Sequence, residues 1–212
     1  MKLSLTRTLF FILLTLSFAF SACTAREPVV QQPEEGQAVH SILILPVEIL
    51  PAFSKKQDKE TARQLNEGTQ VLTGLLHEYF SSTPSVTFIS ETQKDALTSD
   101  FSGCDDSLCR FIGQKMNADA VFRLTLNRFI EREGTNYSVN TPAAITFDYK
   151  LKHVKTGQIL CSGAFDEQQQ SLFANILSFS AKRGLKWLTA EALAREGIEK
   201  KLGSCGYLQP SE

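Results

Sequence analysis

The segment AVFRLTLN, from Ala120 to Asn127, decides the fold class of this chain. Apolar side chains recur at every second position, and polar ones stand between most of them. A period of two predicts a β-strand with one buried and one polar face. The segment ITFDYKLK, from Ile145 to Lys152, repeats the alternation and predicts a second half-buried strand.

The segments around these two strands predict the remaining elements. A tight turn at Lys155-Thr156-Gly157, with glycine able to take the left-handed conformation, leads into a return strand from Gln158 to Asp166. Upstream, the apolar run from Ser41 to Val47 contains Pro46 and predicts a strand buried on both faces. Another short strand is expected from Val86 to Ile89.

Helices are expected between and after the strands. Apolar residues at helical spacing predict a helix from Lys59 to Ser82, stopped by Pro84. We expect a short helix from Glu91 to Leu97, and another through Met116 whose N-cap is supplied by Asp105 and Asp106. Helical sequence then runs from Ser171 to Leu202, either continuous or broken at Gly184, and Gly203 caps it.

The order β-α-β-α-β-β-β-α predicts an α/β (α+β) fold, one domain of two or three layers with a mixed sheet, over residues 40–212. A chain of 212 residues suits one such domain. Its 22 basic and 23 acidic side chains give a net charge of −1, which argues against a nucleic-acid partner.

The first 22 residues predict a signal peptide. Lys2 and Arg7 precede the apolar run from Leu9 to Phe20, which is shorter than the roughly 20 residues of a membrane span. The sequence Phe20-Ser21-Ala22-Cys23 resembles the lipobox of bacterial lipoproteins, with Phe where Leu is usual. This resemblance implies that the Cys23 thiol is acylated, as by palmitate, and becomes the mature N-terminus. The alternative is an ordinary secretory signal cut near Ala22, leaving Cys23 as a structural thiol.

Residues 23–39 are expected to form an acylated N-terminus and a flexible tether. Two prolines and the absence of periodicity mark the linker, which as a coil spans about 20–25 Å. Thr24 follows the cysteine, and resemblance to the enteric sorting rule implies the outer membrane, facing the periplasm. The slightly acidic body is not expected to adhere to anionic lipid on its own, so the acyl group must attach the protein to the membrane.

Three passages carry a further resemblance: SILILPVEIL from Ser41, NADAVF from Asn117, and the hairpin LKHVKTGQILCSG from Leu151. They resemble the periplasmic α/β domain shared by the N-terminal part of TolB, the penicillin-binding-protein activator LpoB and the curli secretion lipoprotein CsgG. The tether is shorter than in LpoB-type activators, and no segment matches the pore strand of CsgG. The resemblance implies an envelope lipoprotein with a protein-binding domain.

Four further cysteines, Cys104, Cys109, Cys161 and Cys205, suggest disulfides in an exported protein and allow three pairings. We favour 104–109, across the start of a helix, together with 161–205. In that interpretation Cys161 shares a strand face with Ile159, and the last helix brings Cys205 to the same face.

No catalytic motif, metal site or cofactor site is predicted, because the cysteines lack metal spacing and the histidines are scattered. His77 is expected at a surface or boundary. Asn136-Tyr137-Ser138 is expected to be a loop. The basic residues Lys182, Arg183 and Lys186, near Trp187, are expected on a solvated helix face, and the alternative is a contact with acidic lipid or a partner. The sequence thus predicts a non-catalytic envelope adaptor with a protein partner. The alternative is a small-molecule or lipid carrier, with an apolar cavity between the sheet and the last helix.

Overall fold

The computed structural model describes residues 38–49, 59–99, 101, 105–134, 139–169 and 188–210. The elements along the chain are β1 (Ile42–Ile44), β2 (Glu48–Ile49), α3 (Lys59–Tyr79), β3 (Val86–Phe88), α4 (Glu91–Thr98), α5 (Asp105–Lys115), β4 (Ala120–Ile130), β5 (Glu133–Gly134), β6 (Val139–Thr141), β7 (Ala144–His153), β8 (Ile159–Gln168) and α6 (Ala190–Leu202). The predicted α/β class is confirmed.

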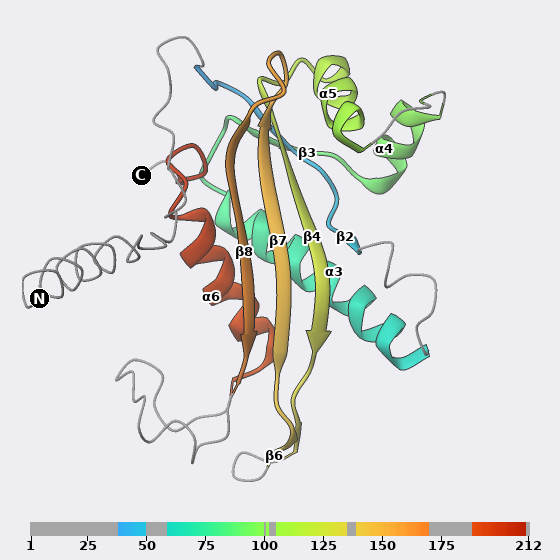
Figure 1. Cartoon of the computed structure of the whole chain (residues 1–212), viewed down its shortest axis with the longest axis vertical. Helices are drawn as coiled ribbons and strands as arrows, with labels where there is room; N and C mark the ends of the chain where they lie inside the picture. The colour runs from blue at the N-terminus through green and yellow to red at the C-terminus, as the bar shows by residue number, and fades with distance from the viewer. Residues whose placement is uncertain are drawn as a thin grey trace, which may run out of the picture. The chain divides into compact units, whose positions relative to one another are not determined.

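The main sheet is mixed and has the strand order β3-β1-β4-β7-β8. β1 runs parallel to both β3 and β4, and β2 continues beside β4 in the same direction. β4, β7 and β8 are antiparallel neighbours. Helices α3 and α6 cross behind these long strands, while α4 and α5 lie near one end of the sheet (Figure 1).

The predicted burial of β1 on both faces is confirmed, because the strand separates two hydrophobic cores. Ile42 and Ile44 belong to the larger core, with α3 and α6. Leu43 and Leu45 belong to the smaller one, with α5. A strand with helices packed against both faces is expected to be apolar throughout, as this one is.

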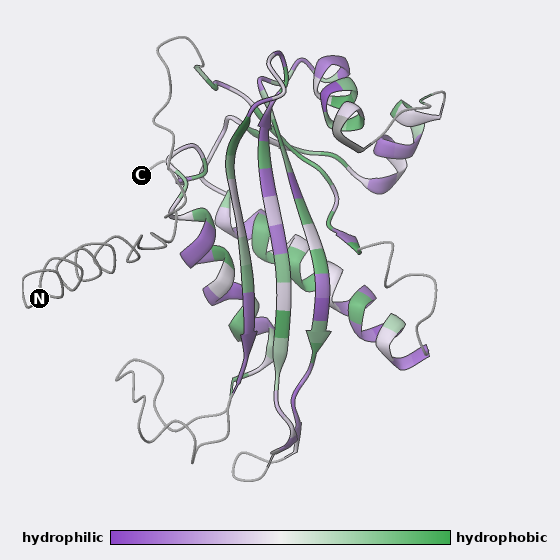
Figure 2. Cartoon of the chain, in the orientation of Figure 1, coloured by the Kyte–Doolittle hydropathy of each residue, from purple (hydrophilic) through white to green (hydrophobic). Residues whose placement is uncertain are grey.

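The alternation in β4 and β7 is also confirmed. One face of each strand enters the larger core, where Phe122, Phe147 and Leu151 are fully buried. The opposite face is polar, and there Arg128 binds Asp166 at 2.7 Å while Thr146 also donates to that carboxylate. The resulting stripes of apolar and polar residues are visible along the strands in Figure 2.

The turn from β7 to β8 has the predicted glycine conformation, with Gly157 at φ 73°. A β-bulge follows. Cys161 pairs with Leu151 and Ile159 pairs with Lys152, so Leu160 is an extra residue without a partner in the register. Since Leu151 and Lys152 are neighbours on one strand, their partners lie on opposite faces. The prediction that Cys161 and Ile159 share a face is therefore wrong: the bulge at Leu160 shifts the alternation by one residue.

Within the predicted helical sequence, the described helix α6 begins at Ala190. Thr189 is an extended N-cap whose side chain accepts a hydrogen bond from the Ala192 amide at 3.1 Å. Gly203 follows the helix as predicted, and its N–H donates to Glu199 O. Residues 170–187, which hold the predicted start and Gly184, lie outside the described residues.

Candidate binding groove

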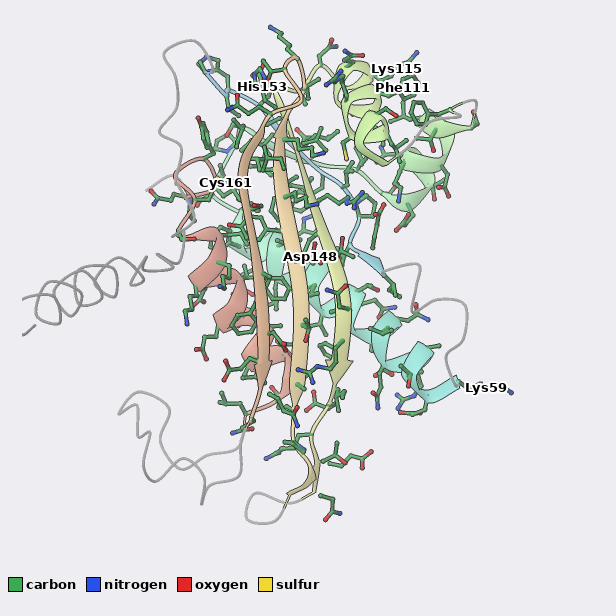
Figure 3. All side chains as sticks on the ribbon, in the orientation of Figure 1. Lys59, Phe111, Lys115, Asp148, His153 and Cys161 are labelled. Carbon is green, nitrogen blue, oxygen red and sulfur yellow. A yellow bond between two sulfur atoms is a disulfide. The ribbon has the colours of Figure 1, made fainter. Side chains whose placement is uncertain are left out.

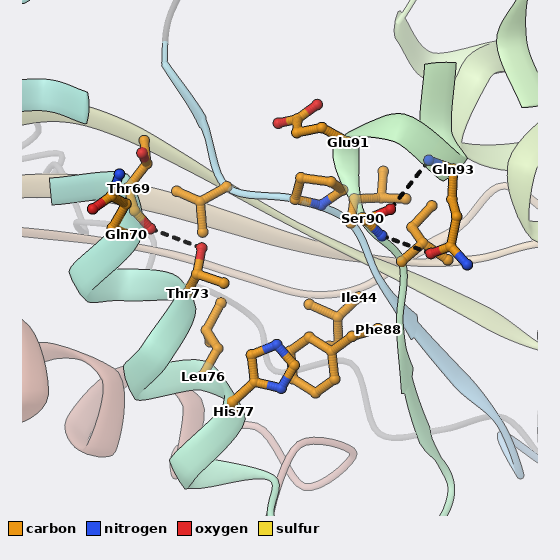
Figure 4. A pocket seen from close by; sticks show the side chains of 14 residues that line it. Ile44, Thr69, Gln70, Thr73, Leu76, His77, Phe88, Ser90, Glu91 and Gln93 are labelled. Carbon is orange, nitrogen blue, oxygen red and sulfur yellow. Dashed lines mark hydrogen bonds between the residues drawn. The ribbon is translucent and has the colours of Figure 1, made fainter. Parts of the chain in front are cut away.

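An open groove lies where β1 and β3 end. The carboxyl ends of adjacent parallel strands meet at one edge of a sheet, and ligands of α/β proteins often bind beside such ends. Here the chain leaves β1 through Leu45-Pro46-Val47 and leaves β3 through Ile89-Ser90, with α3 opposite (Figure 4). The groove has a volume of about 620 Å³, which is within the usual range for small-ligand pockets.

The groove combines an apolar floor with a polar rim. The apolar lining comes from the two strand ends and from one residue of α3: Ile44, Leu45, Pro46, Val47, Leu76, Phe88 and Ile89. The polar lining comes from α3 and the start of α4: Thr69, Gln70, Thr73, His77, Ser90, Glu91 and Gln93. Such a surface can bury apolar groups and offer hydrogen bonds at its margin.

His77 stands at the rim, in the last turn of α3. Its imidazole ring stacks on Phe88 with the ring centroids 3.8 Å apart and an interplanar angle of 21°. The side chain is exposed, as predicted for a surface histidine. This stack joins α3 to the last residue of β3, and both rings line the groove.

Several rim groups are already engaged with their own backbone. Ser90 and Gln93 form a capping box, in which the Gln93 amide donates to Ser90 Oγ and the Ser90 amide donates to Gln93 Oε1. Thr73 Oγ1 donates to Thr69 O at 2.7 Å. A ligand in the groove would therefore gain mainly from apolar contact, and hydrogen bonds would come from the rim atoms that these contacts leave unused.

The acidic group at the rim, Glu91, adjoins a half-buried ion pair. Lys94 Nζ lies 2.6 Å from Glu48 Oε1 and 3.7 Å from Glu91 Oε2. Burial works against the charge of Lys94, but the hydrogen bond and charge of Glu48 outweigh it and raise the Lys94 pKa. The pair ties α4 to β2 and thereby fixes the α4 wall of the groove.

Within the described residues, no three histidine, cysteine or carboxylate side chains gather closely enough to hold a metal ion. The three histidines are dispersed: the His40 amide binds Asp119, His77 stacks on Phe88, and buried His153 contacts Thr156. In the part of the chain that the structure covers, no helix is long and apolar enough to cross a membrane.

The structure describes only some of the cysteines that the sequence analysis singled out. Cys161 and Cys205 form a disulfide with a Cα–Cα distance of 6.1 Å, the pairing favoured from the sequence. Cys109 is buried in α5. Cys23 and Cys104 lie outside the described residues, as do the sequence Asn136-Tyr137-Ser138, the basic residues Lys182, Arg183 and Lys186, and Trp187.

The cavity expected for a carrier protein is filled where the structure shows α6 against the sheet. Leu193 and Ala194 are fully buried there. A Cβ added at Gly197 would lie 2.6 Å from Phe165 Cδ1 and 2.9 Å from Phe147 Cε1. This packing leaves no room between α6 and these two rings.

The sequence analysis did not find the groove. It predicted the two strands and the apolar stripe of α3, but it did not combine their ends. The polar residues Gln70, Thr73 and His77 recur at helical spacing beside that stripe, and they could have indicated the wall of the groove on this helix.

Neither a protein-family model nor a curated protein sequence matches the chain. Solved structures resemble it in fold. PelC of Paraburkholderia phytofirmans, described as a dodecamer, has a TM-score of 0.44 at 11% identity, covering 82% of this chain and 90% of its own. The LpoB C-terminal domain of Salmonella enterica has a TM-score of 0.39 at 19% identity, covering 64% and 87%. Lipoprotein GNA1162 of Neisseria meningitidis has a TM-score of 0.37 at 14% identity, covering 68% and 99%. With TM-scores below 0.5, these likenesses do not assign the chain to a family, and the resemblance to TolB and CsgG stays a prediction.

Proposed function

We propose that this protein is a lipid-anchored envelope lipoprotein that serves as a non-catalytic adaptor or accessory subunit of an envelope assembly, secretion or cell-wall complex. The observation that carries the proposal is the lipobox-like sequence ending in Cys23, followed by a short tether to an α/β domain. The anchor holds the domain near one membrane, in our proposal the outer membrane facing the periplasm. The groove between α3 and the ends of β1 and β3 is the surface proposed to receive an extended, mainly apolar segment of an envelope protein.

Labelling with radioactive palmitate tests the anchor. The wild-type chain is expected to incorporate label, and the Cys23→Ser variant is expected to incorporate none. Equal labelling of both chains would overturn the anchor, because no acyl group could then depend on the Cys23 thiol.

Crosslinking in living cells, followed by mass spectrometry of the isolated membranes, tests the adaptor function. The variant Thr73→Phe puts an aromatic ring into the groove and is expected to remove at least one protein partner that the wild type retains. The matched control, Thr61→Phe, places the same ring on an exposed position of α3 that does not line the groove. An unchanged partner list for Thr73→Phe would contradict docking in the groove.

The volume of the groove supports one alternative, the binding of a small molecule or lipid. Native mass spectrometry of the purified chain distinguishes the two functions. A bound small molecule that Thr73→Phe displaces, without any protein partner, would favour the alternative.

A further inference from the structure

Basic side chains gather at one end of the domain, although the whole chain is nearly neutral. We define this basic end by Arg110 and Lys115 of α5 and by Lys152 and Lys155 of the β7–β8 hairpin. Three of the four are exposed, and Lys152 is half-buried. The two elements adjoin, because Arg110 and Lys152 line one small hollow and the guanidinium of Arg110 lies against Gly157. Lys115 and His153 mark this end in Figure 3.

Exposed apolar side chains adjoin the same basic residues. Among the described residues, Met116 and Ile159 are large apolar side chains that stand exposed to solvent, at 37% and 45%. Met116 directly follows Lys115, whose ammonium group lies 5.5 Å from the centre of the Phe111 ring. Ile159 is the register partner of Lys152. A mixture of cationic and apolar groups is typical of surfaces that lie in a membrane interface.

The tether joins the domain at this end. The His40 and Ser41 amides both donate to the Asp119 carboxylate, at 3.0 and 3.1 Å. The Val154 amide, in the β7–β8 turn, donates to Asp119 O at 2.8 Å. His40 and Ser41, at the start of the body, therefore lie beside the basic hairpin.

Carboxylates stand at the other end of the long strands, with Glu131 and Glu133 after β4 and Asp166 and Glu167 near the end of β8. Two arginines lie among them: Arg128, which is paired with Asp166, and Arg132, which stands between the two glutamates. The net charge of −1 thus conceals an uneven distribution: the four cations of the basic end share it with the carboxylate of Asp119, and the four carboxylates of the opposite end share theirs with two arginines. The expectation that the body does not adhere to anionic lipid considered only the total charge.

We propose that the basic end is a docking surface for the anionic phospholipid headgroups of the membrane that holds the tether. This inference rests on the proposed anchoring, because the tether brings that end to the bilayer. Each lysine close to an anionic surface strengthens binding about five-fold, and the effect falls off within a Debye length of about 8–10 Å. Met116 and Ile159 add apolar contact at the headgroup boundary. The domain then lies on the membrane in one orientation, with the acidic end turned away.

The test uses the chain from residue 24 onward, which has no acylated cysteine and retains residues 33–212, a compact unit by itself. The fraction of this chain that sediments with vesicles is measured for two compositions: phosphatidylcholine alone, and equal parts of phosphatidylcholine and phosphatidylglycerol. Binding is expected on the anionic vesicles only, and added salt is expected to weaken it. The double variant Lys115→Gln, Lys155→Gln is expected to bind about 25-fold more weakly.

Lys59→Gln is the matched control, because Lys59 is exposed and begins α3, far from the basic end (Figure 3). It is expected to bind within two-fold of the wild type. Equal binding to both kinds of vesicle, or an unchanged double variant, would overturn the proposal. So would crosslinks from Lys115 and Lys155 to an acidic protein in the absence of vesicle binding. Since this chain carries no lipid, its result is independent of the palmitate experiment, and failure of either proposal can be recognised separately.

Discussion

Asp119 shows how one side chain organises the entry to the domain. Its carboxylate accepts hydrogen bonds from the His40 amide, the Ser41 amide and Ser41 Oγ, all within 3.1 Å. The His40 amide lowers the Asp119 pKa most, partial burial opposes this, and the Ser41 hydroxyl and amide lower it further. The motif at residues 117–119, singled out in the sequence as part of a resemblance, thus fastens β1 to the start of β4.

Asp119→Asn is expected to lower the free energy of unfolding by about 1–2 kcal/mol at pH 7, because it removes charge-assisted hydrogen bonds. The folded-state pKa of Asp119 lies below the ordinary pKa of an aspartate, so the carboxylate stabilises the fold fully above the unfolded pKa. That contribution disappears as the pH falls through the folded pKa. Urea unfolding of both chains at neutral and at strongly acidic pH measures it. A difference that does not shrink in acid would contradict the charge-based explanation.

At the scale of elements, two helical glycines are expected to respond oppositely to alanine. Gly197→Ala in α6 drives a methyl group into Phe165 and Phe147 and is expected to cost about 1–3 kcal/mol of stability. Gly74→Ala in α3 has open space around the added methyl group and is expected to add about 0.5–1 kcal/mol. Denaturant midpoints of the two variants check both signs. A tolerated Gly197→Ala would show that α6 packs less closely than its contacts indicate.

The local patterns predicted most of the elements but not their irregularities. The alternation in β4 and β7 follows from one buried face, and the uniform apolarity of β1 follows from two. The bulge at Leu160 cannot be recognised in the sequence pattern. A single extra residue moves the following side chains to the opposite face of the sheet without changing the composition of the strand. Thr189 was likewise missed as a helix start, although threonine is a common N-cap.

At the scale of the whole molecule, the disulfide closes a long loop. Cys161 in β8 and Cys205 beyond α6 are separated by 44 positions, so the crosslink restricts a large part of the unfolded chain. Replacing both cysteines by serine is expected to lower the free energy of unfolding by about 2–4 kcal/mol. Thermal unfolding of the double variant against the wild type measures the loss. Coincident transitions would show that the crosslink contributes nothing to stability.

The groove is likewise a property of the whole molecule. Its lining comes from β1, α3, β3 and α4, and it exists because β1 and β3 pair in parallel across more than 40 positions. No local sequence pattern indicates that these two strands pair with each other. The sequence could therefore predict the strands and the helix that form the groove, but not their juxtaposition.

The position of β1 has a mechanical consequence. This strand is hydrogen-bonded on both sides to parallel neighbours, and the chain enters it from the tethered end. A force applied to the residues before β1 along the axis of the strand would load the bonds to β3 and β4 together in shear. They cannot be peeled apart one after another. In the proposed function this connection joins the body to the membrane anchor, and its geometry is expected to resist unfolding when the membrane and a bound partner move apart.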